Sequence, residues 1–242
     1  MRRYRPQTLA YSFGPGPISP AVKWIIWANI GMFVATLAFP VLIEVLGLST
    51  EQIVERAWVW QPVTYMFLHG DAMHILFNML GIWMFGVELE RLWGTRFFLR
   101  YYAVTGIGAA LTTIGVAYLP FEFADAVYTS VTIGASGALY GILLAFAKYY
   151  PNRPILMFFL FPVPAKYFVM IIGALSFLTG GRGIAHAAHL GGLIFGYLYL
   201  RNGRGGLTAE IKYRYLKWKM NRLRRKFDVY SGGRGDWDRH IH

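Results

Sequence analysis

The chain has 242 residues, of which 56% are hydrophobic and only 15% charged, and its mean hydropathy is positive. This composition is too apolar for an ordinary soluble domain and indicates a membrane protein. Because the chain contains no cysteine, a disulfide framework, a thiol nucleophile and a thiolate metal site are excluded. The formal charge of +12 would suit a nucleic-acid binder, but most basic residues lie beside apolar segments, which favours a membrane.

Six apolar segments are candidate membrane spans, since a helix needs roughly 17 to 25 residues to cross about 30 Å of hydrocarbon. In chain order they lie near residues 24–47, 72–87, 97–119, 133–150, 165–179 and 184–200. The first is too long for the core of a signal peptide, so we expect it to be retained. Before the fifth span, Pro162 and Pro164 indicate that residues 155–161 form an interfacial stretch. The predicted fold class is an all-α polytopic membrane protein with six transmembrane helices.

The positions of Lys and Arg predict the orientation of these helices, because cytoplasmic flanks hold such residues in excess. All 24 Lys and Arg except Arg56 and Arg182 fall on one side of the predicted spans. Both termini are therefore expected in the cytoplasm. The predicted organisation is a cytoplasmic lead (1–23), a membrane domain (24–200) and a basic cytoplasmic tail (201–242) that rests on anionic lipid.

Four polar positions stand out within the predicted spans, because a polar side chain at membrane depth is costly and implies a partner or a function. Ser136 begins the fourth span and His189 lies in the sixth. His74 and Asn78 share one face of the second span at positions i and i+4. Taken alone, a serine in a membrane helix usually bonds to its own backbone, and a lone histidine is more often a packing residue than a catalyst.

The glycines beside Ser136 and His189 favour close contact between the fourth and sixth spans. Two stripes have small-xxx-small spacing, which lets helix backbones approach closely in lipid: Gly137 with Gly141, and Gly192 with Gly196. If these stripes face each other, the serine and the histidine meet one turn above the contact.

A serine beside an imidazole is the arrangement that an acyl-transfer nucleophile needs, because the hydroxyl must lose its proton as it attacks. Ser136 also lies at a helix N-terminus, where free backbone N–H groups can bind an oxyanion, and His74 and Asn78 add side-chain donors. No acidic residue flanks His189 in its span. We therefore predict a Ser-His dyad whose imidazole packs on an aromatic ring such as that of Tyr140.

Three motifs resemble those of the rhomboid family of intramembrane serine proteases, and the resemblance covers roughly residues 24–200. Residues 134–137 (GASG) resemble the family's GxSG motif, and residues 74–78 (HILFN) resemble its HxxxN motif. Residues 188–196 (AHLGGLIFG) resemble its AHxxGxxxG motif. The resemblance implies a rhomboid-like six-helix bundle that cleaves single-span membrane proteins near the outer leaflet.

The same resemblance implies roles for individual residues. Ser136 is expected to attack the peptide carbonyl, and His189 to act as base and then acid. The oxyanion is expected to bind His74, Asn78 and the backbone N–H of Ser136. The residues expected to border the substrate are Gly134, Tyr140 and Phe77, with Phe77 beside a lateral gate at the start of the fifth span.

Outside the motifs, the segment between the first two spans resembles the family's long first loop. Trp60 and Gln61 stand where many members have Trp-Arg, so this chain departs from the family there. Glu90 resembles the glutamate of the family's Glu-x-x-x-Gly, which is a structural feature. We expect His69 and His186 to be structural as well.

Other functions stay open at this point. A membrane metalloprotease could use as ligands the four histidines His69, His74, His186 and His189. The HExxH motif of such enzymes is absent. A rhomboid-like protein without catalysis, which binds membrane clients, and a small transporter are further alternatives. We expect no cofactor, no metal and no nucleic acid, with the lipid bilayer and membrane protein substrates as partners. The short basic lead lacks the pattern of a transit peptide, which favours a bacterial inner membrane.

Overall fold

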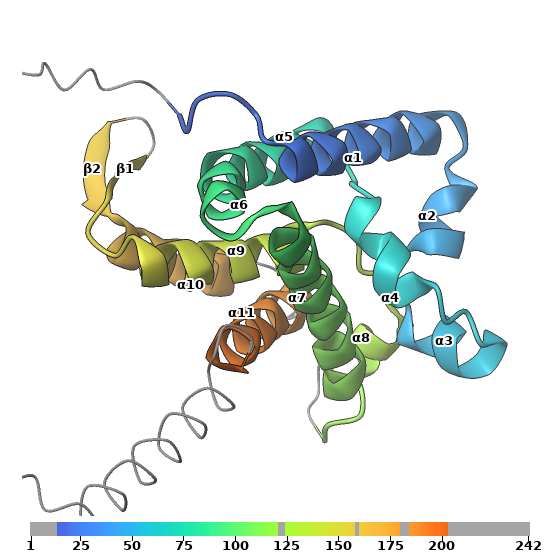
Figure 1. Cartoon of the computed structure of the whole chain (residues 1–242). Helices are drawn as coiled ribbons and strands as arrows, with labels where there is room; N and C mark the ends of the chain where they lie inside the picture. The colour runs from blue at the N-terminus through green and yellow to red at the C-terminus, as the bar shows by residue number, and fades with distance from the viewer. Residues whose placement is uncertain (1–13, 121–123, 158–159, 180–183, 203–242) are drawn as a thin grey trace, which may run out of the picture. The chain divides into compact units, whose positions relative to one another are not determined.

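The computed structural model describes residues 14–120, 124–157, 160–179 and 184–202 (Figure 1). The chain divides into two units, Met1–Tyr199 and Leu200–His242, and almost all of the described residues belong to the first. The basic tail that the sequence predicts lies outside the described residues. The elements in chain order are α1 (Pro20–Ala38), α2 (Val41–Leu46), α3 (Thr50–Arg56), α4 (Gln61–Thr64), η1 (Tyr65–Phe67), α5 (Ala72–Gly81), η2 (Ile82–Gly86), α6 (Val87–Trp93), α7 (Thr95–Val116), α8 (Ala124–Thr129), α9 (Ser136–Tyr149), β1 (Pro154–Met157), β2 (Phe161–Pro164), α10 (Ala165–Thr179) and α11 (Ile184–Asn202).

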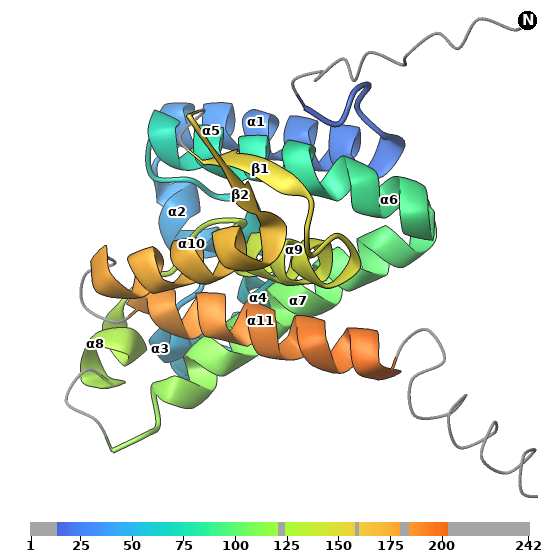
Figure 2. The ribbon, with the colours of Figure 1, turned by 90° about the vertical axis from the view of Figure 1, so that its left-hand side faces the viewer.

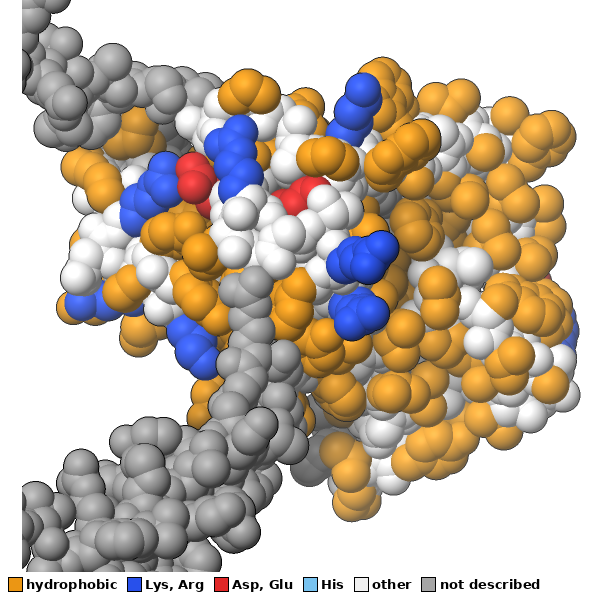
Figure 3. Space-filling model, viewed as in Figure 1, with side chains coloured by type: hydrophobic (Ala, Val, Ile, Leu, Met, Phe, Trp, Pro, Cys, Tyr) orange, Lys and Arg blue, Asp and Glu red, His pale blue; other side chains and the backbone are white. Residues whose placement is uncertain are grey.

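Among the described residues, three helices are long and apolar enough to cross a membrane: α1, the continuous α5–η2–α6 helix (Ala72–Trp93) and α7. A shorter apolar helix covers Ala165–Ser176 of α10. Hydrophobic side chains cover much of the surface in Figure 3, and Trp24 of α1 is 75% exposed, as expected for a lipid-facing helix. The chain is therefore a helical membrane protein, and the number of six spans stays a prediction.

Two predicted spans have different limits in the structure. The first was expected to be one helix over residues 24–47, but α1 ends at Ala38 and α2 begins at Val41. Pro40 explains the break, because its ring restricts the preceding residue and its nitrogen cannot donate a helical hydrogen bond. The second was expected to end at residue 87, but the helix continues through a π-helical turn (η2) to Trp93.

The expectation of an all-α fold is wrong at the connection between α9 and α10. Strands β1 and β2 pair there as an antiparallel ribbon, with Pro154 opposite Pro164 and Met157 opposite Phe161. Prolines cannot continue a helix, but they are tolerated at the ends of edge strands, where their missing N–H faces outward. The predicted interfacial stretch thus takes the form of a two-stranded ribbon.

The connection between α1 and α5 is built from short helices and is tied to the segment that precedes α9. Leu48 and Thr132 exchange two backbone hydrogen bonds of 2.9 and 2.8 Å, and the Gly134 N–H donates to the Tyr65 carbonyl at 2.9 Å. Gln61 stands where many members of the similar family have an arginine. Its side chain is fully buried and accepts a hydrogen bond from the Ser49 N–H at 3.0 Å. These bonds fix the backbone that leads into Ser136.

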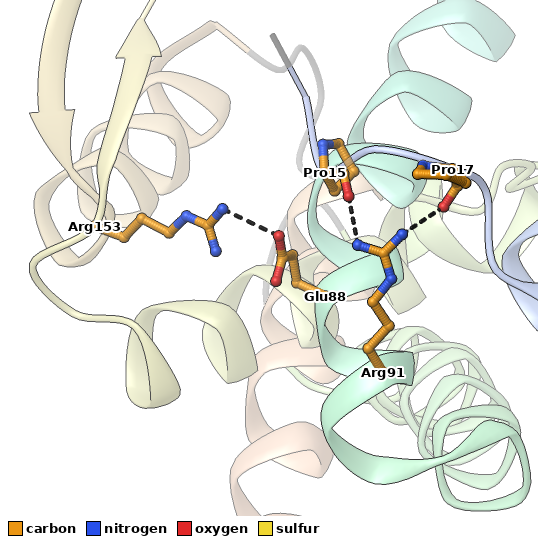
Figure 4. Close-up of polar contacts among 5 residues, drawn as sticks. All are labelled: Pro15, Pro17, Glu88, Arg91 and Arg153. Atoms are coloured by element: carbon orange, nitrogen blue, oxygen red, sulfur yellow. Dashed lines mark hydrogen bonds and ion pairs between the residues drawn. The ribbon is translucent and has the colours of Figure 1, made fainter. Parts of the chain in front are cut away.

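Charged side chains at the C-terminal end of the α5–η2–α6 helix bond to neighbouring segments (Figure 4). Arg153, at the start of the β ribbon, forms an ion pair of 3.0 Å with Glu88 of α6. Arg91 donates to the carbonyl oxygens of Pro15 and Pro17, which lie just before α1. The predicted second span ends at residue 87, and Glu88 and Arg91 instead continue its helix as α6.

Glu90 fixes the start of α1, as expected for a structural residue. Its carboxylate accepts hydrogen bonds from the N–H groups of Ala21 at 2.9 Å and Val22 at 3.1 Å. It also accepts from the hydroxyls of Ser19 and Thr95. A carboxylate at a helix N-terminus compensates the free N–H groups and the helix dipole there.

Helix α9 lies at the centre of the described fold and contacts α5, η2, α6, α7 and α10. Figures 1 and 2 show α9 among these helices, with α10 and α11 side by side next to it. Its buried residues include Gly137, Ala138, Gly141 and Ala145, whose small size lets neighbouring helices approach closely. The first residue of this central helix is Ser136.

Candidate active site

The turn before Ser136 requires a glycine at position 134. Gly134 has φ +122°, a conformation that L side chains rarely adopt. A Cβ there would also lie 2.7 Å from Nε2 of His74 and 3.8 Å from Oγ of Ser136. The backbone of Gly134 thus lies next to both of these side chains, and His74 faces the start of α9.

The structure brings Ser136 and His189 together: Oγ of Ser136 lies 2.9 Å from Nε2 of His189. The glycine stripes explain how α9 and α11 come so close, because a Cβ on Gly192 would lie 1.9 Å from the carbonyl oxygen of Gly137. This contact confirms that the two predicted stripes face each other.

The imidazole of His189 is held on its face and on its edge. The Tyr140 ring stacks on it with a centroid distance of 4.1 Å and an interplanar angle of 13°, which confirms the predicted packing. On the edge, Nδ1 lies 2.8 Å from Oγ of Ser176 in α10. Ser176 was not predicted from the sequence, since a single serine in an apolar helix gives no signal beyond its polarity.

Ser176 also contacts the second histidine of α11. Its backbone carbonyl lies 2.9 Å from Nε2 of His186. A carbonyl oxygen can only accept, so this nitrogen of His186 carries a proton. His186 thus connects α10 to α11, which fits the structural role expected for it.

His74 and Asn78 lie on α5, whose N-terminus is capped by Asp71 through a 2.8 Å bond from the His74 N–H. Nδ1 of His74 is 3.4 Å from the Gly70 N–H, a long contact in which the ring nitrogen accepts. The neutral ring then carries its proton on Nε2, on the side of Gly134 and Ser136.

Asn78 is buried, with 4% of its surface exposed. One N–H of its amide donates to the His74 carbonyl at 2.9 Å, so the side chain partly satisfies its own helix. The second N–H remains for another acceptor, because an amide nitrogen carries two hydrogens. Its Oδ1 has no hydrogen-bond partner among the described residues.

His69 packs edge-on against His74, with ring centroids 4.9 Å apart, and is 1% exposed. It lies in the connection before α5. Burial, with a smaller contribution from His74, lowers the pKa of His69 from 6.5 to about 4. The ring is therefore neutral at pH 7.

The metal alternative required several histidines to converge. Within the part of the chain that the structure describes, no three His, Asp or Glu side chains are grouped as metal ligands. His69 contacts His74, whereas His186 and His189 contact Ser176.

Phe77 lies on α5 at the edge of an apolar cavity of about 340 Å³. The cavity lies between the second helix, α9, β1 and α10, and its lining includes Phe77, Leu139, Phe168 and Ile172. Phe77 is 59% exposed, so it is not a core residue. The structure thus places Phe77 and α10 on the same cavity, and the lateral gate that the resemblance implies stays a prediction.

The family model described as the Rhomboid domain matches residues 56–202, more than half of the chain. Rhomboid protein 1, mitochondrial, of Saccharomyces cerevisiae is 33% identical over 138 residues, covering 55% of this chain and 38% of that protein. Rhomboid protease AarA of Providencia stuartii is 32% identical over 151 residues, covering 57% and 54%. Rhomboid protease GluP of Bacillus subtilis is 30% identical over 152 residues, covering 62% and 27%.

The chain spans only 27% to 54% of the length of these relatives. Together with the apolar helices, the matches support an integral membrane protein similar to intramembrane proteases. Because the yeast relative is mitochondrial, the comparisons do not support the narrower expectation of a bacterial inner membrane.

Proposed function

Because the chain belongs to the rhomboid family, we propose that it is an intramembrane serine endopeptidase with Ser136 as nucleophile and His189 as general base. One observation carries the proposal: the Ser136 hydroxyl, at the N-terminus of a central helix, lies 2.9 Å from an imidazole nitrogen. This distance is within reach of direct proton transfer.

The proposed reaction uses these two side chains in turn. Oγ of Ser136 attacks the carbonyl carbon of the peptide bond while its proton passes to Nε2 of His189. The imidazolium then gives this proton to the leaving amine as the C–N bond breaks, which leaves an ester on Ser136. A water molecule attacks the ester, its proton passes to Nε2, and the proton returns to Oγ as the ester breaks.

Three donors are proposed to stabilise the oxyanion that forms during both attacks. The backbone N–H of Ser136 is at a helix start, where the first N–H groups lack intrahelical acceptors. His74 offers Nε2–H on the side of Gly134, and Asn78 offers its second amide N–H. Donors fixed in this way before the reaction are worth more than donors in water.

The length of α9 supports a site at membrane depth. Its 14 residues rise roughly 21 Å, which is less than the roughly 30 Å of the hydrocarbon layer. Its C-terminal end carries Lys148, and Arg153 and Glu88 pair nearby, so that end suits the water interface. In the proposed six-span topology with cytoplasmic termini, Ser136 therefore lies below the opposite surface.

The proposed substrates are single-span membrane proteins, cleaved in or near their transmembrane segments. Such a segment can approach through lipid, and the apolar cavity between Phe77 and α10 offers it a compatible lining. Gly134 and Tyr140 border the reacting atoms and are proposed to contact the substrate backbone. AarA and GluP are proteases by name, which agrees with this reaction class.

The test is cleavage of a model single-span substrate by the purified full chain in lipid nanodiscs. Ser136→Ala and His189→Ala should each abolish cleavage, and the double variant should be no worse, because the two groups act as a unit. A fluorophosphonate should label the wild type and not Ser136→Ala. Ser130→Ala is the matched control, because the Ser130 hydroxyl donates to the Val127 carbonyl in the preceding helix.

Cleavage by Ser136→Ala at the wild-type rate would refute the proposal. A wild-type protein that binds the substrate, yet is neither active nor labelled, would instead be a rhomboid-like protein that holds membrane clients.

A further inference from the structure

Ser176 of α10 contacts both histidines of α11. Its Oγ is 2.8 Å from Nδ1 of His189, and its carbonyl oxygen is 2.9 Å from Nε2 of His186. One residue thus provides a side-chain contact and a backbone contact, three residues apart on the neighbouring helix. Two contacts of this kind restrict both the position of α10 along α11 and the rotation of the His189 ring.

The proton positions follow from the chemistry of the proposed reaction. To accept the proton of Ser136, Nε2 of His189 must be unprotonated. A neutral imidazole then carries its proton on Nδ1, so Nδ1–H donates to Oγ of Ser176. The Ser176 oxygen can thus accept from the reactive tautomer, and it stays an acceptor when His189 becomes positively charged.

Tyr140 of α9 contacts both α10 and the imidazole of His189. Its hydroxyl donates to the carbonyl of Ile172, which lies one turn before Ser176 in α10, at 3.4 Å. Tyr140 stacks on the imidazole, so Tyr140 and Ser176 hold its face and its edge.

We propose that Ser176 is a positioning residue of the catalytic site, which orients His189 and fixes its proton on Nδ1. The inference rests on the proposed protease function. It gives α10 a part in catalysis besides lining the apolar cavity. If α10 moved away from α11, His189 would lose its hydrogen bond to Ser176 and could rotate. With α10 in place, the imidazole is held toward Ser136.

The kinetic test compares Ser176→Ala with Ser176→Thr in the full chain. Loss of one neutral hydrogen bond should lower kcat by about tenfold. KM should stay unchanged, because Ser176 acts through His189 and does not contact the substrate. Fluorophosphonate labelling should slow by a similar factor. Ser176→Thr keeps the hydroxyl and should recover most of the rate. Thr36→Ala, which removes a buried hydroxyl that donates to the Phe33 carbonyl of its own helix, should match the wild type.

The nitrogen-15 spectrum of the His189 ring tests the hydrogen bond without a substrate. The wild type should show a protonated Nδ1 and an unprotonated Nε2, and Ser176→Ala should show a mixture of tautomers. An alanine variant with wild-type kcat and an unchanged ring spectrum would overturn the inference. If the wild type neither cleaves nor labels, the proposed function fails, and the spectrum alone still decides whether Ser176 fixes the tautomer.

Discussion

At the scale of single residues, Asn78 differs from the other polar groups of the site because its amide already bonds to its own helix. Asn78→Ala should therefore weaken oxyanion binding without removing the covalent route, and His74 remains as a second donor. We expect kcat to fall by about 10² or somewhat less, at the lower end of what one oxyanion donor contributes. The measurement is the steady-state cleavage rate of a purified single-span substrate.

Asn29 provides the matched control for this prediction. It is a fully buried asparagine in α1 whose amide donates to the Ile25 carbonyl at 2.8 Å, the same i−4 pattern. Asn29→Ala should reduce stability and leave kcat near the wild-type value. A larger loss of kcat in Asn29→Ala than in Asn78→Ala would contradict a specific role for Asn78.

The buried His69 predicts a dependence of stability on pH. Its folded pKa is about 4, against 6.5 in the unfolded chain, so between these values only the unfolded chain binds the proton. Stability should therefore fall as the pH falls from 6.5 to 4, by on the order of 3 kcal/mol from this residue. Unfolding followed at several pH values should show a flatter profile for His69→Gln. Parallel profiles would rule this residue out as the cause.

Residues of the site differ in how far the sequence predicts them. Ser136, His189, His74 and Asn78 are visible because each is polar inside an apolar span and has a diagnostic spacing to its neighbours. Ser176 is polar in its span too, but nothing in the spacing relates it to His189. Its contact depends on how α10 lies against α11, which local periodicity does not encode.

At the scale of elements, the glycine contact between α9 and α11 determines whether the serine and histidine meet. Gly192→Ala would place a Cβ within 1.9 Å of the Gly137 carbonyl, so the two helices must separate. We expect a loss of roughly 1–3 kcal/mol in stability and a loss of fluorophosphonate labelling. A Cβ on Gly31 of α1 would meet no other described segment within 4 Å, so Gly31→Ala should lower neither stability nor labelling. Normal labelling of Gly192→Ala would show that the contact is not needed.

Helix positions are well predicted where neither a proline nor an acidic residue interrupts the span, as for α10 and α11, and less well where one does. Pro40 divides the first predicted span. The second helix continues through the charged residues of α6, because Glu88 and Glu90 have partners in neighbouring segments. The β ribbon is invisible to helical periodicity, since its strands have only four residues each. The limits of these elements depend on contacts with distant segments, which local sequence patterns do not reveal.

At the scale of the whole molecule, topology can be tested independently of catalysis. With six spans, all Lys and Arg except Arg56 and Arg182 lie on the cytoplasmic side. A reporter fused after His242 should then be cytoplasmic, and one inserted near Glu122 should be external. Both positions lie outside the described residues, so the reporters add information that the fold does not contain. The reverse pattern, or two reporters on one side, would contradict the six-span topology. It would also remove the argument that Ser136 lies below the outer surface, while the 2.9 Å contact with His189 would still need a function.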